Sequence, residues 1–363
     1  MRSPPTLRDV AQLAGVSIKT VSRVVNDDRE VTDATAAKVR SAIRALNYRP
    51  NPLARSLRTG RDEAIGLVVE TISDPFFAAV TEAVEELARS AGLFLIIASA
   101  GQTPDQERAV VLGLLHRSVC GLIIVPCGLD YASQQLPLGP GGVPVVFIDR
   151  PAPGLDVDTV LIDNKGSARR ATTHLLAQGH RRVAFVGTAI ERFPIRERLD
   201  GYKASLIDAG IEYDPDLIVP HVRTGDGEFR ELSRTFSLDC PPTALFSANA
   251  VASLDVVRYL HSHDRTNIAF VSFDDFPIAE SLTPPVTVAR QDPALLGSTA
   301  IELLLRRIRG GEDLVVETAR QVVLPVTFVE RGSGEIKLTT DAGASQDNKR
   351  LRRPPSRTMA RRS

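Results

Sequence analysis

The chain has 363 residues and a formal net charge of zero, and its 43% apolar and 24% charged content is typical of a globular protein with two or three domains. No stretch approaches the roughly 18 consecutive apolar residues of a membrane span, and residues 1–10 lack the apolar core of a signal peptide, so a cytoplasmic protein without membrane contact is expected. The three cysteines have neither CxxC spacing nor a histidine cluster beside them, which argues against a zinc site or a disulfide framework.

The charge is distributed unevenly along the chain. Residues 1–60 contain 11 Lys and Arg against 5 Asp and Glu, and residues 346–363 contain 7 against 1, so the part between them is acidic. A basic start on an acidic body suggests a polyanionic partner at one end of the chain. Ordinary surface charge would explain the same counts.

The first two helices are predicted from capping signals and periodicity. Thr6 and Asp9 have the spacing of a capping box, Gly15 interrupts the apolar periodicity that follows, and Ser17 can cap a second helix. Three valines form the apolar stripe of that second helix. The opposite polar and basic face consists of Lys19, Ser22, Arg23 and Asn26. Two short helices of this kind have the layout of a helix-turn-helix with its recognition helix.

A third helix is expected from Asp33 to about Leu46, with Ala36, Val39 and Ile43 also facing a small shared core. A plain three-helix domain with a solvated charged face would show the same pattern, so the pattern alone leaves DNA binding open.

Residues 6–60, TLRDVAQLAGVSIKTVSRVVNDDREVTDATAAKVRSAIRALNYRPNPLARSLRTG, resemble the headpiece of the LacI (lactose-repressor) family over nearly its whole length. The segments AGVS, TVSRVVN and NYRPNPLARSLRTG stand in the family's order and spacing. The resemblance implies a DNA-binding headpiece at residues 1–50 and a hinge helix or linker at residues 51–61. A helix this short is marginal alone, so we expect the hinge to fold only against DNA and its dimer mate.

The resemblance also implies roles for individual positions. Ile18, Lys19 and Arg23 match positions that touch base edges in the major groove, where a basic side chain suits guanine and Ile18 would contact a thymine methyl group. The candidates for phosphate contacts are Thr6, Ser17, Thr20, Ser22 and Asn26. The matched hinge contacts are Asn51, Leu53, Ala54 and Leu57, with Leu57 as the apolar wedge in the minor groove.

From Ala64 onwards, short apolar runs alternate with amphipathic stretches. The runs expected as buried strands are residues 64–70, 93–99, 120–126, 143–149, 182–187, 243–249, 268–274 and 287–290. The stretches expected as helices are residues 78–91, 105–115, 165–177, 198–209, 250–261 and 293–309. This alternation indicates doubly wound parallel sheets, and the length favours two Rossmann-like subdomains.

Several enzyme motifs are missing from the sequence. No GxGxxG follows the first strand, and neither GxxxxGK[ST] nor GxSxG occurs anywhere, so nucleotide binding and a hydrolase elbow lack support. The histidines His174, His180, His221, His261 and His263 are expected at helix ends or on the surface. We therefore expect no enzyme activity, no cofactor and no metal.

Polar residues follow several predicted strands, among them Asp149, Asn249 and Asp274. Ligands of such sheets bind beyond the carboxyl ends of the strands, so several polar residues at one edge favour a pocket. Each of them alone is commonly a helix cap.

Residues 61 to about 332 resemble the LacI-family core, which has the type I periplasmic-binding-protein fold. The resemblance depends on AIGLVVETISDPFF, VPVVFIDR, HLLAQGHRRVAFVG, RERLDGYKASLIDAGI, SAN, VSFDD and ARQDPALLG. It implies effector-binding roles for Asp74, Phe76, Phe77, Asp149, Arg198, Asn249, Asp274 and Gln291. Arg198 is expected to donate a two-pronged hydrogen bond to the effector; the alternative is a surface ion pair with Glu197 or Asp200.

One position departs from the family pattern. The family usually has Asp after the asparagine of SAN, whereas this chain has Ala250, and it contains no tryptophan to stack on a sugar. A sugar is the first hypothesis for the effector, and a nucleobase or another metabolite is the second.

The resemblance as a whole implies a transcriptional regulator located at the nucleoid, usually a repressor, whose affinity for a palindromic operator is controlled by a small molecule. Residues 62–332 would form the effector-binding and dimerisation core of a homodimer. Residues 333–363 are polar and basic without a leucine heptad, so we expect a disordered tail and no tetramerising coiled coil. The distant alternative is a ligand-binding module without DNA function.

Overall fold

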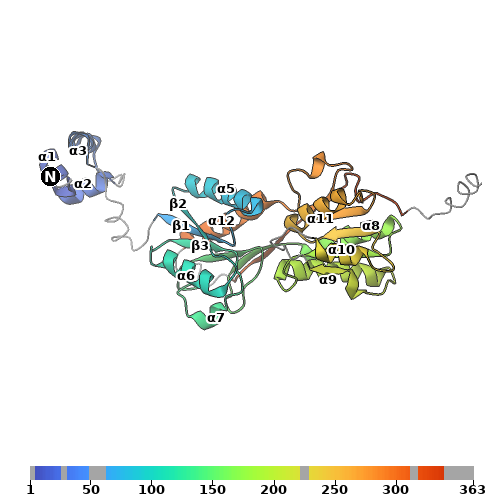
Figure 1. The fold of residues 1–363 in the computed structure, drawn as a ribbon. Helices are drawn as coiled ribbons and strands as arrows, with labels where there is room; N and C mark the ends of the chain where they lie inside the picture. Colours follow the sequence, from blue (N-terminus) through green and yellow to red (C-terminus); the bar gives the residue numbers. More distant parts are fainter. Residues whose placement is uncertain (1–4, 26–30, 49–62, 221–228, 311–317, 339–363) are drawn as a thin grey trace, which may run out of the picture. The chain divides into compact units, whose positions relative to one another are not determined.

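The computed structural model describes residues 5–25, 31–48, 63–220, 229–310 and 318–338. The chain divides into two compact units, which consist of residues 1–160 with 293–321 and of residues 161–292 with 322–363 (Figure 1). We call them unit 1 and unit 2 and describe the headpiece by itself. The predicted DNA contacts at Asn26, Asn51, Leu53, Ala54 and Leu57 lie outside the described residues, as does His221.

The headpiece contains three helices, α1 (Leu7–Ala14), α2 (Ile18–Val25) and α3 (Asp33–Ala45). The predicted capping box is present, since the Thr6 N–H donates to Asp9 Oδ2 at 2.8 Å and the Thr6 side chain accepts from the Asp9 N–H. Gly15 has φ +66°, the left-handed conformation that ends α1. The core of the headpiece consists of Val10, Ala11, Val21, Val24, Val39, Ala42 and Tyr48.

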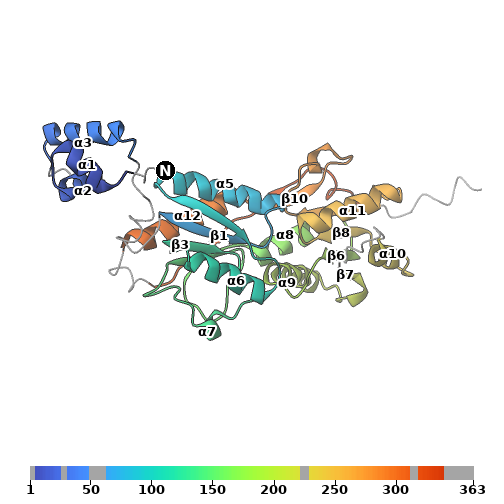
Figure 2. The same cartoon turned by 60° about the vertical axis from the view of Figure 1, so that its left-hand side comes forward.

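The six-stranded sheet of unit 1 has the order β11-β5-β4-β3-β1-β2, and its strands β5 and β11 run across the boundary into unit 2. The strands are β1 (Ala64–Val69), β2 (Phe94–Ser99), β3 (Gly121–Ile124), β4 (Val145–Ile148), β5 (Asp158–Ile162) and β11 (Gln321–Leu324). The helices are α5 (Pro75–Ser90), α6 (Pro104–Leu115), α7 (Tyr131–Gln134) and α12 (Pro293–Gly310). In Figures 1 and 2, α5 and α12 lie together on one face of this sheet and α6 covers the other.

Three strands of this sheet, β2, β5 and β11, differ from the prediction, and β11 was not predicted at all. β2 was expected to be buried, but it is the edge strand, and Phe94 is 74% exposed. β5 was not predicted, because it begins with Asp158 and Thr159 and only three apolar residues follow them. Both polar residues are buried, and the Arg307 guanidinium binds both oxygens of Asp158 at 2.8 Å.

Unit 2 repeats the architecture with the strand order β12-β10-β9-β8-β6-β7, in which only β12 pairs antiparallel. The strands are β6 (Val183–Gly187), β7 (Ile218–Pro220), β8 (Ala244–Ser247), β9 (Ala269–Phe273), β10 (Thr287–Arg290) and β12 (Thr327–Val329). The helices are α8 (Asn164–Ala177), α9 (Phe193–Asp208), α10 (Arg230–Phe236) and α11 (Ala250–Ser262). Gly201 lets α8 and α9 pack closely, because a Cβ there would collide with the Lys165 carbonyl oxygen.

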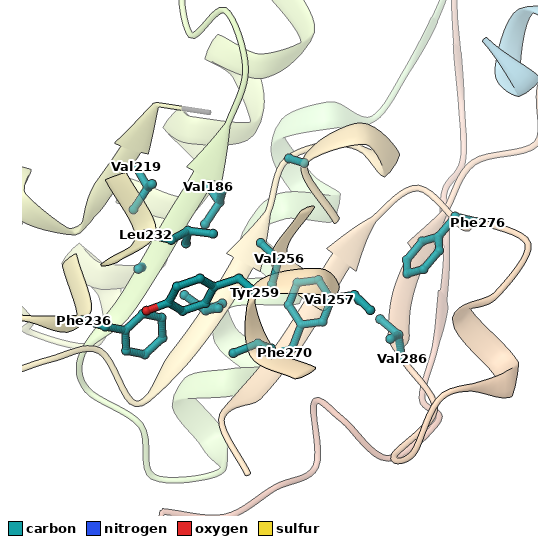
Figure 3. Close-up of a cluster of buried hydrophobic side chains, with 14 of the residues drawn as sticks. Val186, Val219, Leu232, Phe236, Val256, Val257, Tyr259, Phe270, Phe276 and Val286 are labelled. Atoms are coloured by element: carbon teal, nitrogen blue, oxygen red, sulfur yellow. The ribbon is translucent and has the colours of Figure 1, made fainter. Parts of the chain in front are cut away.

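An apolar cluster of unit 2 fills the space between the sheet and the helices α10 and α11. Figure 3 shows Tyr259 of α11 at its centre, with Phe236 of α10 and Phe270 of β9 beside it. The rings of Tyr259 and Phe236 stack with their centroids 5.3 Å apart. This packing fixes α11, whose N-terminus carries the predicted site residue Asn249.

Residues 333–338, the start of the segment expected as a disordered tail, instead pack against unit 2. Ser333 is buried and its Oγ accepts a hydrogen bond from the Thr287 N–H at 2.9 Å. His180, which we expected at a helix end or on the surface, is also buried, and its Nε2 lies 2.8 Å from the Ile336 carbonyl oxygen. Polar residues are therefore part of the core here because they pair with backbone groups of the sheet and of this segment.

Candidate DNA-binding and effector-binding sites

The recognition helix α2 presents the residues that the sequence assigned to DNA. Val21 and Val24 face the headpiece core, whereas Ile18 is 45% exposed and Lys19 is also exposed. Ser17 caps the helix, since its Oγ accepts from the Thr20 N–H at 3.0 Å. The first turn of α2 therefore offers an apolar and a cationic side chain to solvent, next to a helix N-terminus that suits phosphate.

The remaining described headpiece candidates are less exposed or already engaged. Ser22, Arg23 and Thr20 are partly exposed. The Thr6 hydroxyl donates to Asp9 Oδ2 at 2.7 Å, so this donor is used within the headpiece. Hydrogen bonds from the Thr6 backbone and side chain lower the pKa of Asp9 and so favour its carboxylate form.

In unit 1, charged residues meet where the strands β1 and β4 end. Arg150 donates from Nε to Asp149 Oδ2 at 3.0 Å and from Nη2 to Glu70 Oε2 at 3.3 Å. Asp74 caps α5 by accepting from the Phe76 N–H at 2.9 Å. Burial raises the pKa of Asp74, and the nearby carboxylates of Glu70 and Asp149 raise it further.

Sequence reasoning missed two members of this cluster. Glu70 and Arg150 are in the quoted segments AIGLVVETISDPFF and VPVVFIDR, each next to a strand end, so the rule that located Asp149 could have found both. Of the two predicted aromatic residues, Phe77 is buried and Phe76 is only partly buried, with ring centroids 5.1 Å apart. Phe76 is therefore the ring that keeps an accessible surface.

A buried carboxylate holds the chain that follows β3. Glu107 is fully buried and accepts hydrogen bonds from the Cys127 N–H and Sγ, both at 2.9 Å, and from the Tyr131 hydroxyl at 2.6 Å. Burial and then Glu107 raise the pKa of Cys127 to about 12, so this thiol stays protonated and unreactive.

In unit 2, Arg198 is the centre of the candidate site. It is only 2% exposed; its Nε donates to Asn164 Oδ1 at 2.8 Å and its Nη1 to the Ala248 carbonyl oxygen at 2.6 Å. Nη1 also lies 3.4 Å from Asp274 Oδ2, and the guanidinium carbon lies 3.6 Å from the centroid of the Phe273 ring. The surface ion pair considered above is therefore wrong, and Nε and Nη1 are directed to protein acceptors rather than to solvent.

Three more predicted residues lie around Arg198. Gln291 Nε2 donates to Asp274 Oδ1 at 2.6 Å, so Arg198, Asp274 and Gln291 form one network. Asn249 caps α11 by accepting from the Ala252 N–H at 2.8 Å, and its Nδ2 donates to Thr188 Oγ1 at 2.9 Å. Asn164 and Thr188 were not predicted, because only the fold brings them to these partners.

Asp149 and Asp274 occupy the same place in the two sheets. Asp149 follows β4 and Asp274 follows β9, which are the third strands of their sheets counted from β11 and from β12. The two residues have φ +68° and +70°, a conformation that few residues other than glycine adopt. Their backbone N–H groups donate to Val160 and Ala289 of the neighbouring strands at 3.0 and 2.9 Å. Each unit therefore presents a fixed carboxylate at the carboxyl edge of its sheet.

The described residues limit what else this chain can do. Among them, no three His, Cys, Asp or Glu side chains are placed to hold a metal ion. No helix in the described ranges has the length and apolar character needed to cross a membrane.

Comparison with known proteins covers both parts of the chain. Residues 6–51 match the family described as "Bacterial regulatory proteins, lacI family", and residues 172–334 match the periplasmic binding protein-like domain. The HTH-type transcriptional regulator CelR of Thermobifida fusca is 34% identical over 333 residues, which cover 87% of this chain and 97% of CelR. The ribose operon repressor of Escherichia coli K12 is 30% identical over 331 residues, which cover 90% of this chain and 99% of the repressor.

A solved structure extends the similarity to the fold. The Lac repressor dimer bound to operator and the anti-inducer ONPF has a TM-score of 0.77 at 26% identity, over 92% of this chain and 99% of that chain. The predicted fold, helix-turn-helix helices before two parallel α/β subdomains, is confirmed. Because headpiece and core both match relatives over nearly their full length, the chain belongs to the LacI family of bacterial regulatory proteins and is a DNA-binding transcriptional regulator, not an enzyme.

Proposed function

We propose that this regulator is a cytoplasmic, nucleoid-associated repressor that binds a palindromic operator as a homodimer and changes its operator affinity when a sugar binds to the core. The observation that carries the proposal is the exposed first turn of α2, which bears Ile18 and Lys19 beside a capped helix N-terminus. The Lac repressor, a relative of known structure, is a dimer on its operator. Two-fold symmetry of a dimer requires an operator of matching symmetry.

The DNA contacts follow from residue chemistry. We propose that Lys19 and Arg23 donate to guanine, that Ile18 touches a thymine methyl group, and that Ser17, Thr20 and Ser22 contact phosphates. Asn26, Asn51, Leu53, Ala54 and Leu57 remain predictions from the sequence. Thr6 is the weakest phosphate candidate, because its hydroxyl already donates to Asp9.

The charges at the two strand edges favour an uncharged effector with many hydroxyl groups. In unit 1 the carboxylates of Glu70, Asp74 and Asp149 lie close together, and Arg150 binds Glu70 and Asp149. In unit 2, Asp274 pairs with Arg198, and the other predicted residues are neutral amides. An anionic ligand would meet these carboxylates in unit 1, whereas the hydroxyl groups of a sugar would find hydrogen-bond acceptors there.

A nucleobase is the second candidate for the effector. Phe76 keeps an accessible ring surface on which a flat base could stack, and Asp149 of the same unit could accept hydrogen bonds from its N–H groups. The sugar remains the preferred hypothesis because carboxylates and amides outnumber aromatic side chains among the predicted residues.

One experiment tests both parts of the proposal. Duplexes that bind the purified protein are selected from a random pool, without ligand and with D-ribose, cellobiose or adenine. We expect a palindromic site whose enrichment is lost or gained with one of the sugars. A response to adenine alone would replace the sugar by a nucleobase, and no enriched site under any condition would contradict operator binding.

A pair of lysine variants tests the recognition helix on the selected site. Lys19→Ala should weaken operator binding by about ten-fold, in keeping with roughly 1–3 kcal/mol for a base contact. Lys38→Ala is the matched control, because Lys38 is also an exposed lysine of the headpiece but lies on α3. Equal losses in the two variants, measured by fluorescence anisotropy at fixed salt, would contradict a base contact by Lys19.

A further inference from the structure

Three buried serines connect the parts of unit 2 that carry Asn249 and Asp274. Ser247 ends β8, Ser253 lies in the first turns of α11, and Ser272 precedes the end of β9; all three are 0% exposed. The Oγ atoms of Ser247 and Ser253 are 2.6 Å apart, as are those of Ser253 and Ser272. The hydroxyl groups thus form a continuous chain behind the candidate site.

The middle hydroxyl of this chain and one of its ends contact the backbone of predicted effector residues. Ser253 Oγ donates to the Asn249 carbonyl oxygen at 2.8 Å, and Ser272 Oγ donates to the Asp274 carbonyl oxygen at 2.7 Å. Each hydroxyl has one proton to donate, so the three protons must be shared among these acceptors and the neighbouring serines. Removing one hydroxyl therefore changes the hydrogen bonding of the others.

Unit 1 shows that the fold does not need these hydroxyls. Asp149 has the same left-handed backbone as Asp274, yet the residue two positions before it is the buried Phe147 rather than a serine. The Asp149 side chain binds Arg150, as the Asp274 side chain binds Arg198, so the two units share the arginine support and differ at the serine. The serines are thus a feature of unit 2 and not of the architecture that both units share.

We propose that Ser247, Ser253 and Ser272 are positioning residues of the effector site. They fix the Asp274 carboxylate and the Asn249 side chain that caps α11 in their relative positions. The proposal rests on the proposed effector-binding role of Asn249 and Asp274. The bond from Ser272 restrains the backbone of Asp274, and the bonds of Ser253 tie that restraint to the start of α11. None of the three touches the ligand, because all are fully buried.

The first test measures sugar binding by calorimetry, with D-ribose and cellobiose as probes. Ser272→Ala should weaken binding of the responding sugar about five-fold, which corresponds to one lost hydrogen bond of roughly 1 kcal/mol. Thr235→Val is the matched control, because Thr235 is equally buried in unit 2 but its hydroxyl bonds only within α10, to the Glu231 carbonyl oxygen at 3.0 Å. The control should bind the sugar within two-fold of the parent protein.

The double variant Ser253→Ala with Ser272→Ala tests whether the hydroxyl groups of the two serines act as one coupled network or contribute independently to sugar binding. A coupled chain predicts that the double variant loses clearly less affinity than the sum of the two single losses. A lowered Tm in Ser272→Ala with unchanged sugar affinity, or strictly additive losses, would overturn the proposal.

The second test needs no ligand. In a crystal structure of Ser272→Ala, we expect Asp274 to leave its left-handed backbone conformation or its side chain to separate from Gln291. An unchanged Asp274 would overturn the positioning role. If neither sugar binds the parent protein, the proposed effector class fails, but this structure still decides the role of the serines.

Discussion

Replacing Arg198 by methionine tests whether its guanidinium is a buried cation that stabilises unit 2 or a surface charge that contributes little to stability. Methionine has a similar length and no charge, so the change removes hydrogen bonds and the ion pair while it keeps most of the packing. In the parent protein the guanidinium donates hydrogen bonds to Asn164 and to the Ala248 carbonyl oxygen and forms an ion pair with Asp274, all within unit 2. All three acceptors lose the hydrogen bond from Arg198 in the variant.

The expected cost follows from these contacts. A hydrogen bond from a charged donor contributes about 1.5–3 kcal/mol, and breaking one side of a buried ion pair costs about 3–5 kcal/mol. The Asp274 side chain keeps 17% exposure and the bond from Gln291, so part of its charge remains solvated and paired. We therefore expect Arg198→Met to lower the free energy of unfolding of unit 2 by about 4 kcal/mol, against less than about 1 kcal/mol for a surface pair.

Urea unfolding followed by circular dichroism measures the loss, and hydrogen exchange of peptides from β8 and β9 assigns it to unit 2. Arg196→Met is the matched control, because Arg196 is an exposed residue of the same helix two positions away. It should change stability by less than about 0.5 kcal/mol. A loss below about 1 kcal/mol in Arg198→Met, or equal losses in both variants, would refute the reasoning.

Two further predictions concern charges in unit 1. Arg307→Met should lower the free energy of unfolding, measured in urea titrations, by about 3 kcal/mol, because it leaves the buried Asp158 carboxylate without the Arg307 cation. The double variant that also carries Asp158→Asn should recover part of this loss. Asp74→Asn keeps the helix cap and removes a charge whose pKa is raised by burial and by Glu70 and Asp149, so it should raise stability slightly at pH 7, by less than about 1 kcal/mol. That gain should shrink as the pH falls through the raised pKa of the parent carboxyl and vanish below its unfolded value near 3.8; a gain independent of pH would contradict the charge argument.

Two helices begin earlier in the structure than apolar periodicity predicts. We expected α5 from residue 78 and α9 from residue 198, but they begin at Pro75 and Phe193, and both have proline in the first turn. Proline at that position is itself a start signal, since it needs no hydrogen-bond partner for its nitrogen. Apolar spacing locates the middle of a helix well and its first turn poorly.

The residues of the candidate site also fall into two groups, those that the sequence reveals locally and those that only the fold brings together. The sequence placed Asp149 and Asp274 directly after strands, and the structure confirms those positions, because the end of a buried apolar run is visible locally. The partners of Arg198 are not visible locally: Asn164 and Ala248 are separated from it by 34 and 50 residues. The partners of the buried Glu107 are likewise not visible locally, because its donors Cys127 and Tyr131 follow it by 20 and 24 residues.

Asp149 and Asp274 indicate what the two units have in common. Both adopt a backbone conformation that glycine would adopt with less strain, and residues held in this way commonly serve function. An arginine binds the side chain of each, Arg150 for Asp149 and Arg198 for Asp274, and Asp274 additionally receives a hydrogen bond from Ser272 Oγ to its carbonyl oxygen. In both units a cation therefore holds the carboxylate while the backbone keeps a strained conformation, which favours a functional role for the carboxylate itself.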